Sequence, residues 1–289
     1  MLEVSSRQEL RKQLRTWKRA GQKIALVPTM GNLHAGHLAL VKEARELADR
    51  VVTSIYVNPT QFGAGEDLEN YPRTPESDRE ALKLAGCDLV FAPDESTIYP
   101  LGPEKAFKIS PPSALASILE GKFRPGHFDG VVTVVSRLFN LANPDVAVFG
   151  EKDYQQLLII RRMVDDMSFD IDIHAVATVR ESSGLALSSR NNYLEPQQHA
   201  AAQNLFTVLK ETAGLSAHSD ADYSFLEERA EERLKHFGLE PEYVAIRRSE
   251  DLETPRTGDR ALRILAAVRC GSTRLIDNLN LNGACNHAH

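Results

Sequence analysis

Two histidines separated by Ala-Gly give this sequence its strongest chemical signal. His34 and His37 lie in the string that begins at Pro28, directly after the apolar run Ile24–Val27. Residues three apart share one face of a helical turn, so both imidazoles can reach one ligand. The N–H groups and dipole of a helix start attract phosphate, and Gly36 lets a ligand approach the backbone closely. Imidazole donors placed there can stabilise charge that develops on a phosphate.

A metal site is the main alternative for this pair, the other being two incidental histidines at a surface helix start. A structural zinc ion needs four protein ligands and a catalytic one needs three, and the neighbouring sequence supplies no third. The three cysteines lie far apart without a CxxC pair: Cys87, Cys270 and Cys285. We therefore expect neither a structural zinc site nor a disulfide framework, and we expect a reducing compartment.

Amide side chains follow the second apolar run, Val51–Val57. Asn58 and Gln61 come at its end, and amides both donate and accept, so they can bind a hydroxy acid without adding charge. Turn chemistry alone explains the Asn-Pro pair and the glycines, but it does not require Gln61. We expect a ligand loop here, followed by a mobile segment over Gly63–Thr74 that acts as a lid.

Charged side chains precede a helix expected over Asp129–Leu141. Arg124 and His127 stand just before it, where they can meet an anionic substrate. The plainer alternative leaves Arg124 solvated. In either case we expect Asp129 or a neighbour to cap the helix.

Lys152 follows another apolar run, Val146–Phe149. A lysine is a compact charge suited to a nucleotide phosphate, Asp153 can bind ribose hydroxyls, and Gln156 lies about one helical turn beyond. The alternative is that Asp153 only caps a helix and that Lys152 only lies on the surface.

Two hydroxyls and a guanidinium come together further along the chain, at Ser188, Ser189 and Arg190. Such a group at a hinge is suited to close over a triphosphate. A serine-rich interdomain linker is the alternative, and the local sequence alone does not decide between them.

The segments together resemble a known family. His-x-Gly-His after a first strand is the signature of the nucleotidylyltransferase superfamily, and the longer string PTMGNLHAGHLALV is similar to that of the pantothenate synthetase family. The string FGEKDYQQL, residues 149–157, matches that family's motif letter for letter. The resemblance is dense from Pro28 to Tyr193 and thinner from Glu195 to Asp277.

The resemblance implies an ATP-dependent condensation of (R)-pantoate with β-alanine to pantothenate. It implies a pantoyl-adenylate intermediate, release of AMP and pyrophosphate, Mg²⁺ on the ATP phosphates without protein ligands, and a homodimer. The catalytic residues expected are His34, His37, Lys152, Ser188, Ser189 and Arg190. ATP is expected to contact these six and also Met30, Gly36, Gly150, Asp153, Val179 and Leu187. Pantoate is expected to contact Met30, Asn58, Gln61, Phe62, Val131 and Gln156. The candidates for β-alanine or another anion are Arg124 and His127.

The elements that must position these loops alternate between apolar runs and helix-length periodic segments. Such alternation predicts the α/β class, with a Rossmann-like parallel sheet whose ligands lie beyond the carboxyl ends of the strands. The expected strands are Ile24–Val27, Val51–Val57, Leu89–Ala92, Val146–Phe149 and Ile171–Val179. The expected helices are Gly36–Asp49, Pro75–Ala85, Asp129–Leu141 and Asp153–Met167.

The pattern changes after about Val179. We expect a smaller C-terminal α+β domain that covers the site, with domains over residues 1–177 and 178–289. Its helices are expected at Pro196–Ala213 and Ser224–Phe237, and its strands near Tyr243–Ile246, Leu262–Val268 and Arg274–Asp277.

The composition and the remaining motifs exclude several classes of protein. A net charge of −6 argues against a broad nucleic-acid or membrane surface. The N-terminal segment carries charges of both signs and no apolar core, and no apolar run approaches the roughly 20 residues of a membrane span. We therefore expect a soluble, cytoplasmic protein without nucleic-acid or membrane partners. Gly63-x-Gly65 lacks the rest of a dinucleotide fingerprint, and no Walker sequence occurs.

Two rival functions remain. A nucleotidylyltransferase that keeps the nucleotide in its product would share the two histidines and the Ser-Ser-Arg string. A non-catalytic nucleotide sensor or tRNA-associated module is the rival from another class. Gln61, Gln156 and the FGEKDYQQ string favour the ligase, and the presence of both histidines and Lys152 argues against a sensor.

Overall fold

A six-stranded sheet forms the first part of the molecule, in the order β1-β4-β3-β2-β5-β6. The computed structural model describes residues 1–63, 65–216 and 222–281. Every pairing in this sheet is parallel. Its strands are β1 (Leu2–Val4), β2 (Ile24–Thr29), β3 (Arg50–Ile55), β4 (Leu89–Phe91), β5 (Val146–Gly150) and β6 (Asp172–Val176). The predicted Rossmann-like parallel sheet is confirmed.

The strand order creates a switch point between β2 and β5. The chain runs from β2 to β3 and β4 on one side and then returns to β5 on the other. In register, Ala25 pairs with Val51 of β3 and with Val146 of β5, so the carboxyl ends of the three strands lie together. Ligands of open parallel sheets bind in the crevice at such a point.

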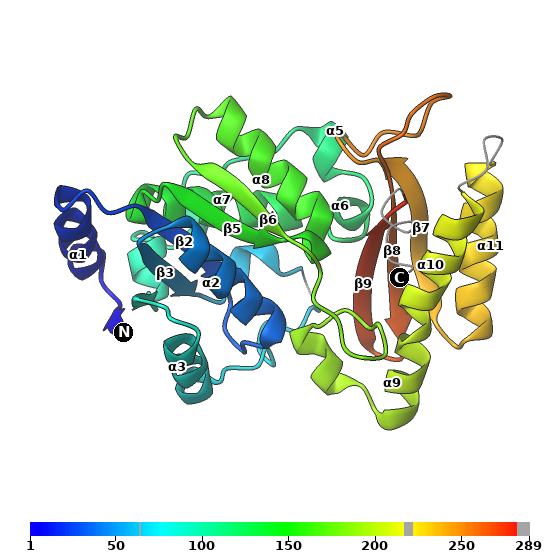
Figure 1. Ribbon diagram of the computed structural model, residues 1–289, viewed down its shortest axis with the longest axis horizontal. Coiled ribbons are helices and arrows are strands. Elements are labelled where there is room, and N and C mark those ends of the chain that lie inside the picture. The colour runs from blue at the N-terminus through cyan, green and yellow to red at the C-terminus, as the bar shows by residue number, and fades with distance from the viewer. Residues whose placement is uncertain (64, 217–221, 282–289) are drawn as a thin grey trace.

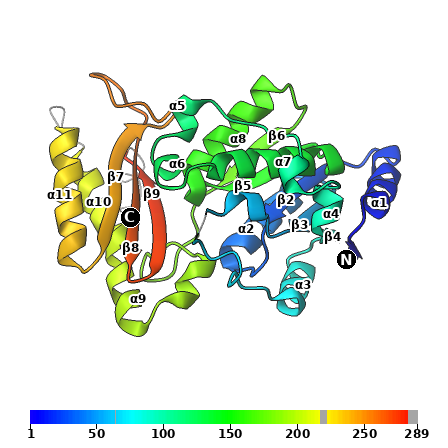
Figure 2. The same ribbon diagram turned by 180° about the vertical axis from the view of Figure 1, so that it is seen from behind.

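Helices cover both faces of this sheet (Figures 1 and 2). One face packs against α1, α7 and α8, through strand residues such as Leu26 and Val52. The other face packs against α2 and α3, through residues such as Ala25 and Val27. Burial on both faces explains why the strands are continuous apolar runs. The helices are α1 (Arg7–Arg19), α2 (Ala35–Leu47), α3 (Pro75–Leu84), α7 (His127–Ala142) and α8 (Tyr154–Asp166).

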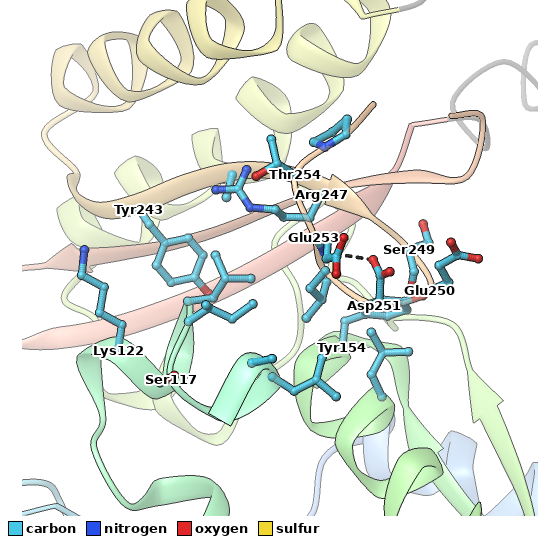
Figure 3. Close-up of a pocket in the computed structure, with 18 of the residues that line it drawn as sticks. Ser117, Lys122, Tyr154, Tyr243, Arg247, Ser249, Glu250, Asp251, Glu253 and Thr254 are labelled. Carbon is cyan, nitrogen blue, oxygen red and sulfur yellow. Dashed lines mark hydrogen bonds between the residues drawn. The ribbon is translucent and has the colours of Figure 1, made fainter. Parts of the chain in front are cut away.

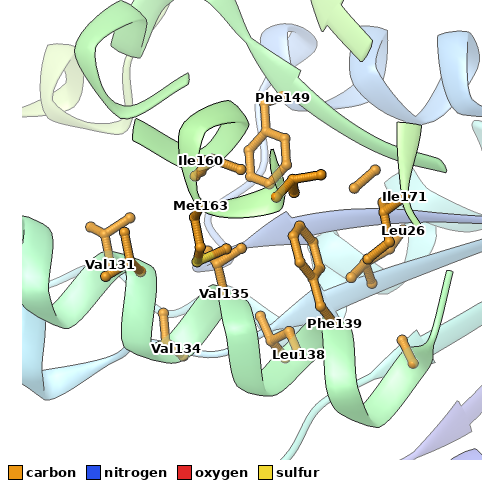
Figure 4. Close-up of a cluster of buried hydrophobic side chains, with 14 of the residues drawn as sticks. Leu26, Val131, Val134, Val135, Leu138, Phe139, Phe149, Ile160, Met163 and Ile171 are labelled. Atoms are coloured by element: carbon orange, nitrogen blue, oxygen red, sulfur yellow. The ribbon is translucent and has the colours of Figure 1, made fainter. Parts of the chain in front are cut away.

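Helix α7 is the centre of the largest apolar cluster (Figure 4). Its side chains Val135 and Phe139 point toward Phe149 of β5 and toward Ile160 and Met163 of α8. Phe139 is 1% exposed, and the Phe139 and Phe149 rings meet edge to face at 6.4 Å. Truncating such a ring costs about 3–5 kcal/mol, so this cluster fixes α7 firmly behind the site.

A second, three-stranded antiparallel sheet follows. Its strands are β7 (Glu240–Arg248), β8 (Leu262–Cys270) and β9 (Thr273–Asn280). Its helices are α9 (Pro196–Ala202), α10 (Asn204–Leu215) and α11 (Tyr223–His236). The predicted α+β character is confirmed, but the strands are longer than predicted and the expected helix Pro196–Ala213 is divided at Gln203. An apolar cluster from Leu185 to Leu281 belongs to this part alone. It agrees with a division at 177/178, which stays a prediction.

Several short elements had no sequence prediction. They are β1, η1 (Pro59–Gln61), α4 (Glu95–Ile98), η2 (Pro103–Lys105), α5 (Ser113–Ala116), α6 (Glu120–Phe123), η3 (Glu151–Asp153) and η4 (Ser189–Tyr193). Each is too short to show a period. Helix α1 could have been predicted from the sequence, because Ser6 and Glu9 have the spacing of a capping box and form one at its start.

Within the described residues, no helix is long and apolar enough to span a bilayer. Cys87 and Cys270 are free and buried, whereas Cys285 and the tail from residue 282 fall outside the described residues. The cytoplasmic location stays a prediction.

Candidate active site

A cavity of about 250 Å³ lies at the carboxyl ends of β2, β3 and β5. Every predicted site residue but Asn58 lines it, so five segments far apart in the sequence meet at one place. The predicted residues on its wall are Met30, His34, Gly36, His37, Gln61, Phe62, Arg124, His127, Val131, Gly150, Lys152, Asp153, Gln156, Val179, Leu187, Ser188, Ser189 and Arg190.

The two histidines after β2 form the cap of helix α2. The backbone N–H of Gly36 donates to Nδ1 of His34 at 3.1 Å, and the backbone N–H of His34 donates to Nδ1 of His37 at 3.3 Å. Both Nδ1 atoms therefore act as acceptors, which places the proton of each neutral ring on Nε2. The rings lie 4.1 Å apart and line the cavity, so they offer it two N–H donors.

Both rings are neutral at ordinary pH. Burial lowers the pKa of His34 to about 4, and the positive charge of Lys152 adds a smaller contribution in the same direction. Burial also lowers the pKa of His37 to about 3, and His34 and Lys152 add to the effect. Neutral donors can bind a phosphate oxygen without first losing or gaining a proton.

Gly36 is required for a reason that differs from the predicted one. A Cβ at this position would lie 2.8 Å from Cε1 and 2.9 Å from Nδ1 of His34. The glycine thus leaves room for the His34 ring to fold back onto the helix start. Close approach of a ligand to this backbone stays a prediction.

Asn58 does not line the cavity, and its predicted contact with pantoate stays a prediction. The side chain is 1% exposed and its polar atoms are engaged. Nδ2 donates to Gln61 Oε1 at 3.1 Å and to Gly130 O at 3.2 Å, and Oδ1 accepts from the hydroxyls of Thr60 and Tyr99. Asn58 therefore orients Gln61, whose Nε2 lies 3.2 Å from the sulfur of Met30. The sequence could not tell which of the two amides faces inward.

Arg124, which follows α6, and His127, the first residue of α7, both reach the cavity. Nδ1 of His127 lies 2.8 Å from the carbonyl oxygen of Gln61, so it carries the proton and donates. Nε2 then accepts from Arg124 Nη1 at 3.1 Å. Burial and the charge of Arg124 lower the pKa of His127 to about 4. His127 is a neutral link between Arg124 and the loop after β3.

The predicted capping of α7 by the side chain of Asp129 or a neighbour is wrong. The helix begins at His127, its N-cap is Gly126 in the left-handed region at φ 81°, and no side chain caps it. Asp129 lies within the first turn, where its negative charge interacts favourably with the positive end of the helix dipole.

Gly130, in the same turn, must be a glycine for steric reasons. A Cβ at this position would lie 2.3 Å from the carbonyl oxygen of Thr60.

Acidic residues of the segment 63–74 bind both cavity arginines. Arg124 forms two hydrogen bonds with Glu66, at 2.6 and 2.7 Å. Arg190 pairs with Asp67 at 2.8 and 3.2 Å. Burial raises the pKa of Glu66, but Arg124 outweighs this and holds it below its usual range. The sequence predicted this segment as a mobile lid; residue 64 falls outside the described residues, and the lid role stays a prediction.

Lys152 and Asp153 follow β5, facing the two histidines across the switch point. Asp153 takes the N-cap position of α8, but its carboxylate makes no capping bond. It lies 3.8 Å from the Lys152 ammonium and is 48% exposed, so it remains accessible from the cavity.

The Ser-Ser-Arg group is tied to the loop after β2. Ser189 donates to the carbonyl oxygen of Asn32 at 3.2 Å, and Ser188 accepts from the backbone N–H of Arg190 at 3.2 Å. Ser188 thereby fixes the turn that presents Arg190. These contacts favour an ordered part of the site over the alternative of a serine-rich interdomain linker.

Comparisons with known proteins agree with this geometry. The family model for pantoate-beta-alanine ligase matches residues 3–280. A pantothenate synthetase from Thioalkalivibrio sulfidiphilus is 53% identical over 279 residues, 96% of this chain and 97% of that protein. One from Neisseria meningitidis is 52% identical over 93% of this chain and 96% of its own. The chain belongs to the pantoate-beta-alanine ligase family.

Solved structures of the family share the whole fold. The pantothenate synthetase of Thermus thermophilus superposes with a TM-score of 0.91 at 44% identity, covering 97% of this chain and 99% of that one. The pantoate-beta-alanine ligase of Francisella tularensis, described in complex with beta-gamma ATP and beta-alanine, has a TM-score of 0.80 at 34% identity and covers 98% of each chain. Membership of the ligase family decides against a nucleotidylyltransferase that keeps the nucleotide in its product.

The same cavity is also lined by residues that the sequence did not predict. Tyr56, Tyr71, Leu40, Val134, Val135 and Leu138 also line the cavity. Tyr71 is 6% exposed, and its ring lies edge to face with Phe62 at 5.8 Å. The helical spacing of the apolar residues in α7 could have predicted Val134 and Leu138, because they lie on the same face of the helix as Val131.

A larger cavity of about 1360 Å³ lies elsewhere, between the α5–α8 region and β7 with its following loop (Figure 3). No predicted site residue lines it, and several of its charged side chains form ion pairs. Arg247 pairs with Glu227, and Glu242 pairs with Arg269 and Arg274. It lies away from the carboxyl ends of the parallel strands, so the smaller cavity is the candidate active site.

Proposed function

We propose that this chain joins (R)-pantoate to β-alanine at the expense of ATP, through pantoyl adenylate, in the cavity at the carboxyl ends of β2, β3 and β5. The observation that carries the proposal is the convergence of two neutral histidine N–H donors and Lys152 on a cavity that also holds neutral amides. The Francisella tularensis relative, described with beta-gamma ATP and beta-alanine, supports the choice of nucleotide and amine.

In the first step, a carboxylate oxygen of pantoate attacks the α-phosphorus, and the bond to pyrophosphate breaks. Negative charge grows on the α-phosphate and on the leaving group. The donors Nε2–H of His34 and His37 and the ammonium of Lys152 stabilise this charge, with Ser188, Ser189 and Arg190 on the leaving pyrophosphate. Since no group must change its proton, this step depends on positioning.

Pantoate binds between amides and an apolar wall. Gln61, held by Asn58, and Gln156 of α8 bind its hydroxyl and carboxylate groups. Met30, Phe62 and Val131 contact its two methyl groups. Because the amides carry no charge, they leave the pantoate carboxylate nucleophilic.

In the second step, the neutral amine of β-alanine attacks the activated carbonyl carbon, and the bond to AMP breaks. The nitrogen loses a proton as the amide forms. Arg124 is placed to bind the β-alanine carboxylate, and His127 holds the guanidinium in place. The adenylate must be protected from water, which is the role we assign to segment 63–74.

Magnesium fits this site as part of the nucleotide. Within the described residues, no three His, Cys, Asp or Glu side chains gather to hold an ion, and Asp153 is the one carboxylate on the described cavity wall. Mg²⁺ would arrive on the phosphates and neutralise their charge, and Asp153 would be the carboxylate available to hold it. We further propose a homodimer of two-domain subunits, divided at 177/178, as the resemblance implies.

The test separates the two half-reactions. Pyrophosphate release is measured with ATP and pantoate alone, and AMP release after β-alanine is added. We expect pyrophosphate without β-alanine, and AMP with pantothenate only when it is present. Lys152→Ala should lower the first step on the order of 10²- to 10³-fold. Lys12→Ala, on the exposed face of α1, is the matched control. Pyrophosphate release with another acid, but not with pantoate, would overturn the substrate assignment.

A further inference from the structure

Strand β9 of the second sheet lies directly behind the turn that carries Lys152. It is the strand of that sheet nearest the parallel sheet in both views (Figures 1 and 2). Alternate side chains along a strand share one face. On β9, Arg274 reaches Glu120 and Asn278 reaches the turn Glu151–Asp153. One strand thus contacts two segments of the site.

The side-chain amide of Asn278 binds two consecutive backbone carbonyls of that turn. Its Nδ2 donates to the oxygen of Glu151 at 2.9 Å and to the oxygen of Lys152 at 2.8 Å. An amide nitrogen has two hydrogens, and both are used here. Asn278 is 4% exposed, so water does not compete for these bonds.

The orientation of the amide is fixed by an arginine. Arg263, itself buried, donates to Oδ1 of Asn278. A guanidinium can only donate, so the oxygen must face Arg263 and the nitrogen must face the turn. Arg263 is held in turn by the ring of Tyr154, 3.8 Å from its guanidinium carbon. The backbone N–H of Asn278 donates to Asp277 at 2.7 Å.

Among the described residues, no side chain of the turn caps it, and Glu151 only contacts Arg263 at 3.4 Å. Gly150 precedes η3 without a side-chain cap, and Asp153 precedes α8 without one. Lys152 has a long, flexible stem, so the direction of its ammonium depends on the backbone from which it starts. Two carbonyl bonds from a rigid strand define that backbone.

We propose that Asn278 is a positioning residue for Lys152, and that β9 thereby makes adenylation depend on the placement of the second sheet. The inference rests on the proposed role of Lys152 in the first step. Asn278 does not touch the reacting atoms. It fixes the peptide groups at 151 and 152, so the ammonium points into the cavity before the nucleotide arrives. The alternative is a contact that only stabilises the packing of the two sheets.

A double-mutant cycle distinguishes the two. Pantoate-dependent exchange of pyrophosphate into ATP is measured for the unmodified chain, Asn278→Ala, Lys152→Ala and the double variant. We expect Asn278→Ala to lower kcat roughly 10- to 100-fold with little change in the KM of pantoate, because small misplacements of a catalytic group have effects of that size. In the Lys152→Ala background, Asn278→Ala should cause no further loss. Losses that multiply would overturn the proposal.

Asn278→Asp is the second variant, because it keeps the volume and the contact with Arg263. It replaces the N–H donors with an oxygen that repels both carbonyls, so kcat should fall at least as far as with alanine. If Asn278→Ala does not fold, the cycle is run with Asn278→Asp. Full activity of a folded Asn278→Asp would overturn the proposal.

Asn204→Ala is the matched control. Asn204 lies in the same part of the chain, and its Nδ2 also donates to two carbonyls, of Ala200 and Ala201, both at 3.1 Å. It does not line the cavity, so its loss should leave kcat unchanged. If Lys152→Ala itself had no effect, the assigned role of Lys152 and the present inference would both fall. A normal Lys152 effect with multiplicative losses would overturn the inference alone.

Discussion

At the scale of single residues, the site depends on histidines that stay neutral and are fixed in opposite tautomers. The Nδ1 atoms of His34 and His37 accept backbone N–H groups, so their Nε2–H groups face the cavity. His127 donates from Nδ1 to Gln61 and accepts at Nε2 from Arg124. The local backbone therefore decides which ring nitrogen is available, before any ligand is bound. Such preorganised donors require no rearrangement as charge develops.

His37→Ala is expected to lower kcat of pantoate-dependent pyrophosphate exchange on the order of 10²- to 10³-fold. The variant also loses the acceptor for the N–H of His34, which should lower the free energy of unfolding by about 1 kcal/mol. His37→Gln keeps a side-chain donor and should retain more activity than alanine. Exchange kinetics and thermal melts of both variants check this. Equal activity of the two would show that the ring donor is not used.

At the scale of the elements, strand ends were predictable and side-chain partners were not. Apolar runs located β2, β3 and β5, and the rule that ligands lie beyond carboxyl ends placed the right loops at one site. The pairing of Arg124 with Glu66 had no local signal, because 58 residues separate them. Asn278 was missed because its partners lie more than 120 residues earlier.

The segment 63–74 should act as a seal through its two acid–arginine pairs. Glu66→Gln with Asp67→Asn removes both charges that hold it to Arg124 and Arg190. Water should then reach the adenylate, so more than one AMP should form for each pantothenate. The ratio is measured by chromatography at saturating pantoate and limiting β-alanine.

The matched control for this pair of changes is Glu69→Gln. It lies in the same segment and is exposed, and among the described residues its carboxylate pairs with no arginine. Its ratio of AMP to pantothenate should stay at one. An unchanged ratio in the double variant would contradict the sealing role.

At the scale of the whole molecule, buried charges join the two sheets. Glu120 of α6, 7% exposed, accepts two hydrogen bonds from Arg274 of β9, both at 2.7 Å, and one from the Tyr243 hydroxyl at 2.8 Å. Burial raises the pKa of Glu120, but Arg274 holds it below its usual range. Because the next residues along the chain lead to Arg124, this contact connects the second sheet to the site.

Glu120→Gln should lower the free energy of unfolding by about 3 kcal/mol, since it leaves a buried guanidinium with less compensation. Chemical denaturation at neutral pH measures the loss. Glu76→Gln removes one of the two exposed partners of Arg79, the other being Glu3, and should cost less than about 1 kcal/mol. Equal losses for the two variants would mean that the contact between the sheets adds no more than a surface pair.

The same neutral histidines make the whole molecule sensitive to mild acid. The folded pKa values of His34, His37 and His127 are about 4, 3 and 4, below the value of roughly 6.5 for an unfolded chain. As the pH falls through about 6.5, the unfolded chain takes up protons that the folded chain refuses, so stability falls. Lowered pKa values of Glu66 and Glu120 act in the same direction, but only below about 4.5. Between pH 7 and pH 5 the free energy of unfolding should therefore drop by up to about 2 kcal/mol for each of the three rings, so the loss comes mainly through the histidines. Urea denaturation at several pH values tests this, and His127→Gln should flatten the slope. A flat profile for the unmodified chain would mean that these rings are protonated in the folded state, and the neutral-donor account of the first step would fall with it.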